Sequence, residues 1–296
     1  MLPKGTEKSK ELIEAYSFIS PLLLFILLFI FVPVVGTIVT SWFKATTFLS
    51  EKFIFFENYR LLFKDVNFWQ SAQFTFLFIL VSVPIELFLG ILFALVLNCT
   101  IPLRGLLRVC VLIPWAIPAA ISARIWELIY NYNYGLLNFL FMKLGIIPKP
   151  INWLGTSLGA FFSLIIADVW KTTSFVAIIL LAGLQVIPEE LYAQAQVDRA
   201  DFLQRFYRVT LPLLKPAIIV VLLFRTIDAL RVFDLIYVIT SGGPGGTTTS
   251  LSLYAYKYFV GGDFGYGSAL SVILFLIAFF MSIVYVKLAG FSKELA

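Results

Sequence analysis

The sequence contains no histidine, and its only cysteines are Cys99 and Cys110. The missing histidine excludes metal sites built on imidazole, histidine general bases and histidine pH switches. The two cysteines lack the spacing of metal ligands, so we expect them to be small apolar side chains. No G-x-x-x-x-G-K-[ST] segment is present to hold nucleotide phosphates, and no nucleophile stands beside a base. The sequence therefore predicts no catalytic residue, no metal site and no cofactor in this chain.

Charged residues are scarce as well. They make up 13% of the 296 residues, whereas 60% are hydrophobic and the mean hydropathy is +0.96. A soluble domain has about 45–50% apolar and about 25% charged residues, so this composition excludes a water-soluble globular domain. The apolar residues form unbroken runs of about 20, typical of transmembrane helices, without the alternation of transmembrane strands. We therefore expect an all-α membrane protein, whose net charge of +5 relates to orientation and not to nucleic acid.

Six apolar runs predict six transmembrane helices. They cover residues 16–42, 68–98, 106–130, 158–184, 211–240 and 267–289. The first run is too long for a cleavable signal, and Pro21 and Pro33 lie inside it. The chain is thereby divided into an amino-terminal segment, residues 1–15, a transmembrane domain, residues 16–289, and a tail, residues 290–296.

Lysine and arginine predict the orientation of these helices. With the amino terminus inside, the basic residues of the inner connections outnumber those of the outer ones. The excess is modest, but the short second connection holds Arg104 and Arg108 and no acidic residue. Both termini are therefore expected in the cytoplasm, where the terminal segments would place Lys4, Lys8, Lys10 and Lys293.

The connection between the fourth and fifth runs, residues 187–210, is polar and differs from the other connections. Apolar residues from Leu191 to Val209 recur at helical spacing and fall on one face. Asp198 and Arg199 interrupt this face, so we expect two short helices with a bend, the second helix being capped by Asp198. Two interpretations are open: an amphipathic segment that packs on its own bundle, or a segment that docks on another protein.

This segment resembles the cytoplasmic loop of permease subunits of binding-protein-dependent carbohydrate ABC importers. The usual form of that loop is P-x-E-L-Y-E-A-A-x-x-D-G-A, followed by F and by I-x-L-P. Ala193 replaces the usual glutamate, Gln194 the alanine and Arg199 the glycine. Because glycine alone adopts a positive φ without cost, Arg199 predicts a less tight bend. The matching residues are Pro188, Glu190, Leu191, Tyr192, Ala195, Asp198, Ala200, Phe206, Leu211 and Pro212.

Further segments are similar to the same family, so the resemblance covers nearly the whole chain. Within the carbohydrate branch, they look closest to maltose- and trehalose-type first permeases. The segments are GILFALVLN at 90–98, the arginine, proline and tryptophan series at 104–138, DVWKTTSF at 168–175, FRTIDALRVFD at 224–234 and FDLIYVITSGGP at 233–244.

The resemblance implies an ATP-driven importer of the cell (inner or plasma) membrane, in which this chain forms half of the pathway for a di- or oligosaccharide such as a maltose or trehalose relative. It also implies three protein partners: a second similar permease, an ATPase dimer that binds ATP and magnesium, and an extracytoplasmic solute-binding protein. The glycine-rich outer loop would either be a plain linker or contact that binding protein through Gly242, Gly243 and Pro244. The residues expected to couple to the ATPase are Glu190, Leu191, Tyr192, Ala193, Ala195, Asp198, Arg199, Ala200 and Phe206.

Charged residues inside the predicted spans are costly and are usually paired. Several lie three residues apart, as Asp168 and Lys171 do, so each span can neutralise itself locally. Two interpretations are open: a ladder of structural ion pairs, or the polar lining of a sugar cavity. Aromatic residues near these charges are also typical of the membrane interface. The cavity interpretation assigns sugar contacts to Trp170, Lys171, Asp228, Arg231, Asp234 and Tyr237.

Acid and base pairs also fit another class, a secondary transporter or channel driven by an ion gradient. Against this class, six spans without an internal repeat are unusual for such folds, and a helical loop outside the membrane would have no task. A membrane-embedded enzyme is a third class, for which the sequence offers no catalytic constellation.

Overall fold

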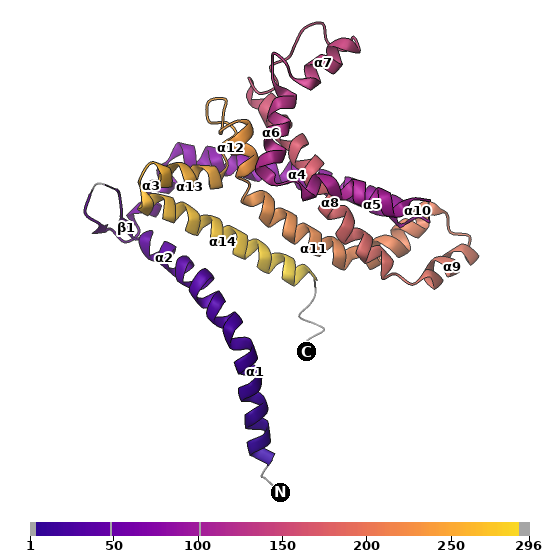
Figure 1. Ribbon diagram of the computed structural model, residues 1–296, viewed down its shortest axis with the longest axis horizontal. Coiled ribbons are helices and arrows are strands. Elements are labelled where there is room, and N and C mark those ends of the chain that lie inside the picture. Colours follow the sequence, from indigo (N-terminus) through magenta and orange to yellow (C-terminus); the bar gives the residue numbers. More distant parts are fainter. Residues whose placement is uncertain (1–3, 48, 101, 290–296) are drawn as a thin grey trace. The chain divides into compact units, whose positions relative to one another are not determined.

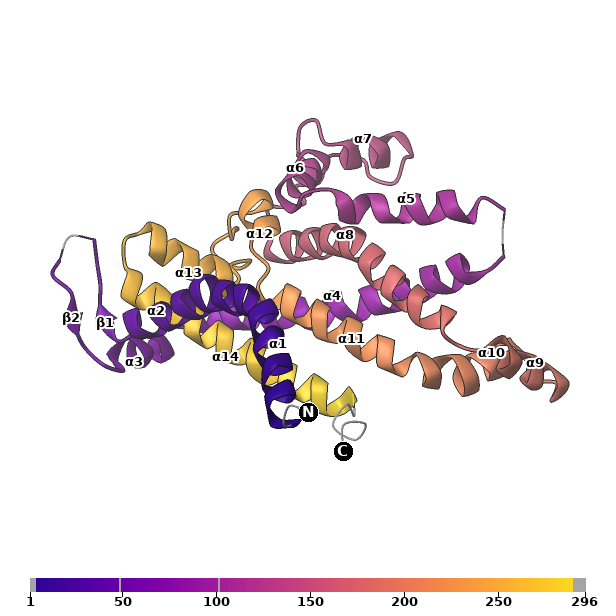
Figure 2. The same ribbon diagram turned by 60° about the horizontal axis from the view of Figure 1, so that its bottom comes forward.

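The computed structural model describes residues 4–47, 49–100 and 102–289, and it places the side chains of residues 11–47, 49–100 and 102–288. The tail expected at residues 290–296, with Lys293, lies outside the described residues, as do the side chains of Lys4, Lys8 and Lys10. The described chain is almost entirely helical (Figure 1, and turned in Figure 2), which confirms the all-α prediction. The strands in the described part form one short hairpin.

The helices form two compact units. The first comprises the described residues up to Lys64 together with Lys257–Ile273. The second, which contains most of the helices, comprises Asp65–Tyr256 and the described residues from Leu274 onward.

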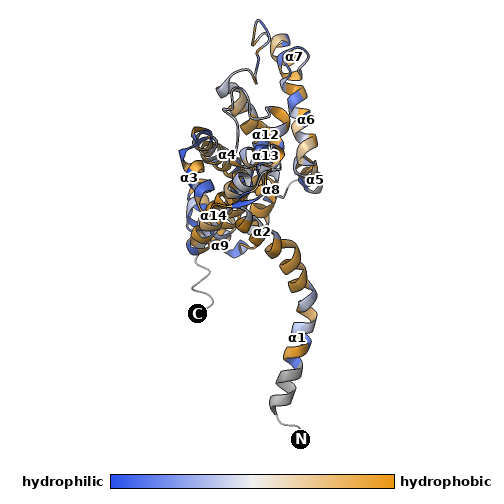
Figure 3. Cartoon of the chain, turned by 90° about the vertical axis from the view of Figure 1, so that its left-hand side faces the viewer, coloured by the Kyte–Doolittle hydropathy of each residue, from blue (hydrophilic) through white to orange (hydrophobic). Residues whose placement is uncertain are grey.

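The first unit begins with one long apolar helix. α1 (Lys4–Ile26) continues through the π-helical turn η1 (Leu27–Phe31) into α2 (Val32–Thr40). All side chains over residues 11–33 are exposed in this chain, and most of them are hydrophobic (Figure 3). An exposed apolar helix of this length requires an apolar surrounding, as a membrane span has.

A hairpin and a short helix complete the amino-terminal part of the first unit. β1 (Phe43–Lys44) pairs antiparallel with β2 (Lys52–Phe53), and α3 (Glu57–Lys64) follows. Asn58 on α3 donates its side-chain amide to two backbone carbonyl oxygens at the start of the hairpin, at 2.8 and 2.9 Å. This buried amide ties the helix to the hairpin.

In the second unit, three long helices pack along one another. α4 (Val66–Asn98) pairs with α8 (Ser157–Gln185), and α11 (Leu211–Leu230) packs against both (Figure 2). The shorter elements of this unit are α5 (Arg104–Ala116), α6 (Ala119–Tyr130), α7 (Leu136–Lys143), α9 (Glu189–Val197), α10 (Phe202–Arg205), the π-helical turn η2 (Phe206–Thr210) and α12 (Asp234–Ile239). Both units receive residues from α13 (Leu251–Val260) and α14 (Phe264–Ala289).

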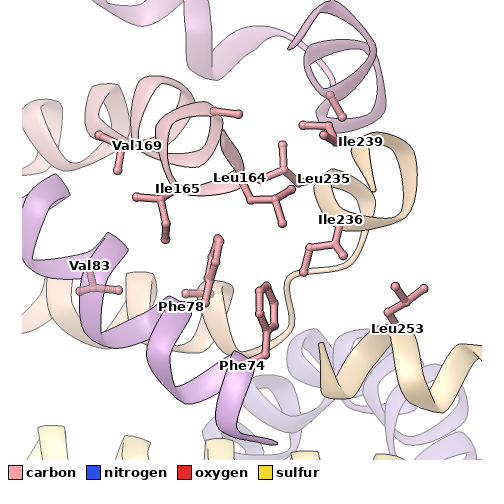
Figure 4. Close-up of a cluster of buried hydrophobic side chains, with 13 residues drawn as sticks. Phe74, Phe78, Val83, Leu164, Ile165, Val169, Leu235, Ile236, Ile239 and Leu253 are labelled. Carbon is pink, nitrogen blue, oxygen red and sulfur yellow. The ribbon is translucent and has the colours of Figure 1, made fainter. Parts of the chain in front are cut away.

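The core of the second unit lies where α4, α8 and α12 meet (Figure 4). Phe74 and Phe78 of α4 pack with Leu164 of α8 and Ile236 of α12, and all four side chains are buried. A second apolar cluster joins α4, α8 and α11 nearer to α9. Cys99 and Cys110 are exposed, so they do not fill either cluster in this chain.

The described residues contain fewer uninterrupted spans than the six that the sequence predicts. Four helices are long and apolar enough to cross a membrane: Glu11–Thr40, Val66–Asn98, Ser157–Gln185 and Phe264–Leu288. α5 and α6 give a fifth span if they are counted together, although the chain bends by 90° between them. The run predicted at 211–240 does not form one helix, because α11 and α12 are separate. α11 also carries several charges, so its composition alone does not identify it as a span.

Proline explains several of these irregularities. Pro118 restricts the residue before it to extended backbone, and Ile117 accordingly has φ −70° and ψ 130°, which separates α5 from α6. The π-helical turns η1 and η2 end two residues before Pro33 and Pro212. Because proline has no amide hydrogen and its ring displaces the preceding turn, a wider turn is favoured there.

Candidate functional site

One buried arginine connects the three long helices of the second unit. The side chain of Arg225 on α11 is only 3% exposed. Its Nε donates to Oε2 of Glu86 on α4 at 2.6 Å, and its Nη2 donates to Oε1 of the same carboxylate at 2.9 Å. Nη2 also donates to Oδ2 of Asp168 on α8 at 3.1 Å. One side chain therefore ties α4, α8 and α11 together within an apolar bundle.

The same arginine extends the network to a more exposed pair. Nη1 of Arg225 donates to Oδ2 of Asp228 at 2.7 Å. Oδ1 of Asp228 accepts in turn from Nη2 of Arg231 at 3.2 Å. The side chains of Asp228 and Arg231 are 51% and 74% exposed. The network thus has a buried end at Glu86 and an exposed end at Arg231.

The prediction of local pairing within each span is only partly right. Pairs three residues apart are confirmed within α6, within α11, and between Asp228 of α11 and Arg231, the residue that follows this helix. The prediction is wrong for Asp168 and Lys171, because Asp168 pairs with Arg225 of another helix and Lys171 donates to backbone carbonyl oxygens. Glu86, the single charge in its span, also pairs with Arg225. Spacing along one helix cannot show these partners, since it carries no information about neighbouring helices.

Lys171 stabilises the break between α5 and α6. Its Nζ donates to the carbonyl oxygens of Pro114 at 3.4 Å, Trp115 at 3.2 Å and Ile117. The last carbonyl groups of a helix have no partner within that helix, and a cation there also interacts favourably with the helix dipole. A side chain of α8 thereby holds the carboxyl end of α5 beside Pro118.

Two cavities meet at Asp228 and Arg231. The first has a volume of about 400 Å³ and is also lined by Phe175, so we name it the Phe175 cavity. The second, the Asp234 cavity, has a volume of about 260 Å³ and is also lined by Asp234. Thr172 lines both. Their walls combine carboxylate, guanidinium and hydroxyl groups with aromatic rings, which suits a ligand that has hydroxyl groups and an apolar face.

Four of the six residues predicted to contact sugar line the Asp234 cavity: Lys171, Asp228, Arg231 and Asp234. Trp170 and Tyr237 do not belong to the described lining of either cavity. The Trp170 ring lies against Trp126 with centroids 5.7 Å apart, and the Tyr237 ring stacks on Phe233 at 5.4 Å. Phe233 lines the Asp234 cavity in their place. Phe233 and Thr172 were not among the predicted sugar contacts, although each lies one residue from a predicted contact.

Residues 187–210 form two helices with a bend, as predicted. The predicted cap is wrong, because Asp201 and not Asp198 caps α10. Oδ1 of Asp201 accepts from the backbone N–H of Gln204 at 2.7 Å, and the Gln204 side chain accepts from the Asp201 N–H at 3.1 Å. Asp198 instead ends α9.

The bend itself is formed by Arg199, which has a φ of 57°. Glycine adopts this left-handed region without strain, whereas other residues rarely do. The N–H of Ala200 donates to the carbonyl oxygen of Ala195 at 2.9 Å and closes the end of α9. The expectation that arginine in place of glycine gives a less tight bend is therefore wrong.

The residues predicted to couple to an ATPase fall into three groups according to their surroundings. Four line a cavity of about 430 Å³ beside α9 and α10: Leu191, Ala195, Asp198 and Ala200. Two line a separate cavity of about 360 Å³ that reaches the end of α4: Tyr192 and Phe206. Three line neither cavity and are exposed: Glu190, Ala193 and Arg199.

The glycine-rich loop after α12 is held by its own hydrogen bonds. Oγ1 of Thr248 donates to the carbonyl oxygen of Gly243 at 2.6 Å. The backbone N–H of Thr248 donates to the carbonyl oxygen of Gly242 at 3.2 Å. Of the three residues predicted to contact a binding protein, Gly242 is buried and Gly243 and Pro244 are partly buried. The exposed tip of the loop comes after them, at residues 245–247.

Replacing Arg225 with methionine should destabilise the second unit strongly. The change leaves Glu86 and Asp168 buried without their cation, and removing one partner of a buried ion pair costs about 3–5 kcal/mol. Thermal unfolding in detergent measures this loss. The control is Arg124→Met, because Arg124 is an exposed arginine paired three residues away on α6, and we expect little change. Equal stability of the two variants would contradict the structural importance of Arg225.

Arg199→Gly should leave stability unchanged or raise it by up to about 1 kcal/mol, because glycine removes the steric cost of the left-handed conformation. Arg199→Val should lower stability, since a β-branched side chain is strained there. Arg205→Gly is the control within the same segment and should cost about 1 kcal/mol, because Arg205 is helical. If both glycine variants lower the unfolding temperature equally, Arg199 does not adopt this conformation.

Known proteins with similar sequences come from solute uptake systems. A family model described as "Binding-protein-dependent transport system inner membrane component" matches residues 86–290. The chain is 51% identical over 288 residues to the trehalose/maltose transport system permease protein MalF of Thermococcus litoralis, and the alignment covers 97% of each chain. It is 40% identical over 273 residues to the sulfoquinovosyl glycerol transport system permease protein SmoG of Agrobacterium fabrum, with 91% of this chain and 88% of that relative covered.

A solved structure shares the fold. A chain in the crystal structure of a bacterial ABC transporter involved in the import of the acidic polysaccharide alginate matches with a TM-score of 0.83 and 23% identity, covering 96% of this chain and 97% of that chain. The family match covers well over half of this sequence, and a relative at 51% identity covers nearly all of it. This chain therefore belongs to the family of inner membrane components of binding-protein-dependent transport systems, the non-catalytic permease subunits of ABC importers.

Proposed function

We propose that this permease forms half of the translocation pathway of an importer for a di- or oligosaccharide of the trehalose or maltose type. The observation that carries the proposal is the pair of cavities that meet at Asp228 and Arg231, because they bring polar groups into an otherwise apolar bundle. The sugar class follows from the relative that is named for trehalose and maltose transport and is 51% identical.

The walls of the cavities suit a neutral sugar. Hydroxyl groups of the sugar can donate to the carboxylates of Asp228 and Asp234 and accept from Arg231 and Lys171. Phe175, Phe233 and Trp115 offer aromatic surface to the apolar face of a sugar ring. We assign the sugar contacts to the residues that line the cavities, and not to Trp170 or Tyr237.

Partner proteins would supply the remaining functions. An ATPase dimer that binds ATP and magnesium would dock on the cytoplasmic segment 187–210, and a second permease would complete the pathway. A solute-binding protein would dock outside, at the tip of the loop that follows Pro244. Six crossings result if α5–α6 and α11–α12 are each counted as one broken span, with both termini in the cytoplasm.

The cytoplasmic segment 187–210 is connected to the helix that lines the cavities. Oη of Tyr192 on α9 and Oγ1 of Thr210 are 3.1 Å apart, so α9 is bonded to the end of η2. η2 continues directly into α11, which carries Arg225 and Asp228. Movement of α9 during ATP-driven closure of the ATPase would therefore displace α11 and change the cavities along it.

Transport by the reconstituted complex tests this proposal. Proteoliposomes that contain this chain with its partner permease and ATPase should accumulate trehalose or maltose only when ATP and the binding protein are both supplied. Uptake that follows an imposed proton or sodium gradient without ATP would contradict the proposal and support a secondary transporter. Uptake of neither sugar under any condition would contradict the proposed substrate class.

Ala200→Trp tests the coupling segment. A bulky side chain in the 430 Å³ cavity should cost about 1–3 kcal/mol of packing, on the order of ten- to hundredfold in affinity for the ATPase. The variant should keep its fold but lose the ATPase during purification. Ala120→Trp is the matched control, because Ala120 is exposed on α6 and should retain the ATPase. Retention of the ATPase and of sugar-stimulated hydrolysis by both variants would show that this segment is not the coupling element.

A further inference from the structure

We propose that the Asp228–Arg231 ion pair is a gate between the Phe175 cavity and the Asp234 cavity, and that Arg225 is the positioning residue that holds Asp228 while the gate opens. This inference rests on the proposed function, since it requires that sugar moves along these two cavities. Arg231 is then the side chain that moves and Asp228 the one that stays, although both line the same two cavities.

The two cavities follow one another along the bundle. On α8, the Asp234 cavity reaches Asp168, whereas the Phe175 cavity reaches Phe175, about two turns further along. On α11, the Phe175 cavity begins at Phe224, and the Asp234 cavity extends beyond the helix to Leu235. The residues that line both are Thr172, Asp228 and Arg231. These three side chains therefore lie at the junction of the two cavities, where a molecule moving from one to the other comes into contact with them.

The two partners of Asp228 hold it with unequal strength. Arg225 is buried and donates to Oδ2 at 2.7 Å, and it is held in turn by Glu86 and Asp168 through three further hydrogen bonds. Arg231 is 74% exposed and donates to Oδ1 through longer bonds, from Nη2 at 3.2 Å and from Nε at 3.4 Å. Buried, multiply bonded arginines resist displacement, whereas exposed ion pairs are weak and are screened by water. When the pair separates, Arg231 therefore moves and Asp228 stays.

A sugar offers replacements for both halves of the broken pair. One hydroxyl group can donate to the freed Oδ1 of Asp228, and another hydroxyl oxygen can accept from the guanidinium of Arg231. Without sugar, the two side chains satisfy each other and separate the cavities. The closed pair thus opposes passive leakage of sugar. When a ligand with several hydroxyl groups binds, its hydroxyls replace the ion pair, and both charged side chains keep a hydrogen-bond partner. A ligand with an acidic group would instead bring a second carboxylate against Asp228, which is unfavourable.

Passive efflux from proteoliposomes tests the gate. The complete importer is reconstituted, the vesicles are loaded with labelled trehalose or maltose, and efflux is followed without ATP or binding protein. Arg231→Gln should raise efflux about two- to fivefold, the factor expected when an exposed ion pair is lost. Arg231→Lys should restore low efflux, because it retains a cation. Arg124→Gln is the matched control, since Arg124 is 67% exposed in a pair three residues apart outside both cavities, and its efflux should not change.

Glu86→Gln tests the positioning role of Arg225. The change preserves the size of the side chain but weakens the hold on Arg225, so Asp228 loses its fixed orientation. Because Glu86 is part of a buried ion pair, the yield of assembled complex should fall, so import is measured per assembled complex. On that basis we expect a higher KM for sugar import with an unchanged maximal rate. A purely structural role would lower the yield and leave the KM unchanged.

The outcomes separate the gate from the proposed function. If the wild-type complex imports these sugars but Arg231→Gln shows wild-type efflux, the gate is wrong and the proposed function stands. A wild-type KM in Glu86→Gln overturns the positioning role. If the wild-type complex imports neither sugar, the proposed function fails, and the gate fails with it.

Discussion

The guanidinium group of Arg225 is the interaction on which the second unit depends. Apolar side chains pack α4, α8 and α11 together, but they do not determine which polar groups face one another. A planar group with several donors in fixed directions can bind carboxylates of three different segments at once, which a lysine could not do in the same geometry. Glu86, Asp168 and Asp228 are all held by it. The register of the three helices and the position of Asp228 at the cavities follow from this one side chain.

Interrupted helices provide the space next to that network. In a membrane, backbone that is not helical is tolerated only where protein buries it or where it lines a cavity. The break between α5 and α6 meets this condition, because Lys171 of α8 donates to the carbonyl oxygens that the break exposes. The break between α11 and α12 provides the wall of the Asp234 cavity through Phe233 and Asp234. Both breaks thus lie where the apolar bundle becomes polar.

The segment outside the long helices is joined to this site through the backbone. α9, the bend at Arg199 and α10 lead into η2, which is continuous with α11. The hydrogen bond between Tyr192 and Thr210 also joins α9 directly to the end of η2. α9 is thereby linked to α11, the helix that carries Arg225 and Asp228.

Composition and local periodicity predicted much of this protein. Apolar runs identified the helical, membrane-spanning character. A chain with so few charged residues cannot cover such runs with a polar surface, so it cannot bury them in water. The helical spacing around Leu191 and the interruption at Asp198 and Arg199 predicted two helices with a bend. The same local reasoning failed at the N-cap of α10. Asp198 and Asp201 are both residues of a type that caps helices, and only the path of the backbone places Asp201 at the start of α10.

Tertiary structure alone decided the partners of the charged residues. Glu86 and Asp168 lie far from Arg225 in the sequence, and their pairing depends on how α4, α8 and α11 pack. Lys171 has an acid three residues away, but it donates to the end of α5, because the bend at Pro118 brings unpaired carbonyl groups within its reach. Spacing along a helix determines which residues share a face of that helix. The partner of a buried charge is determined by the neighbouring helices, which no local pattern specifies.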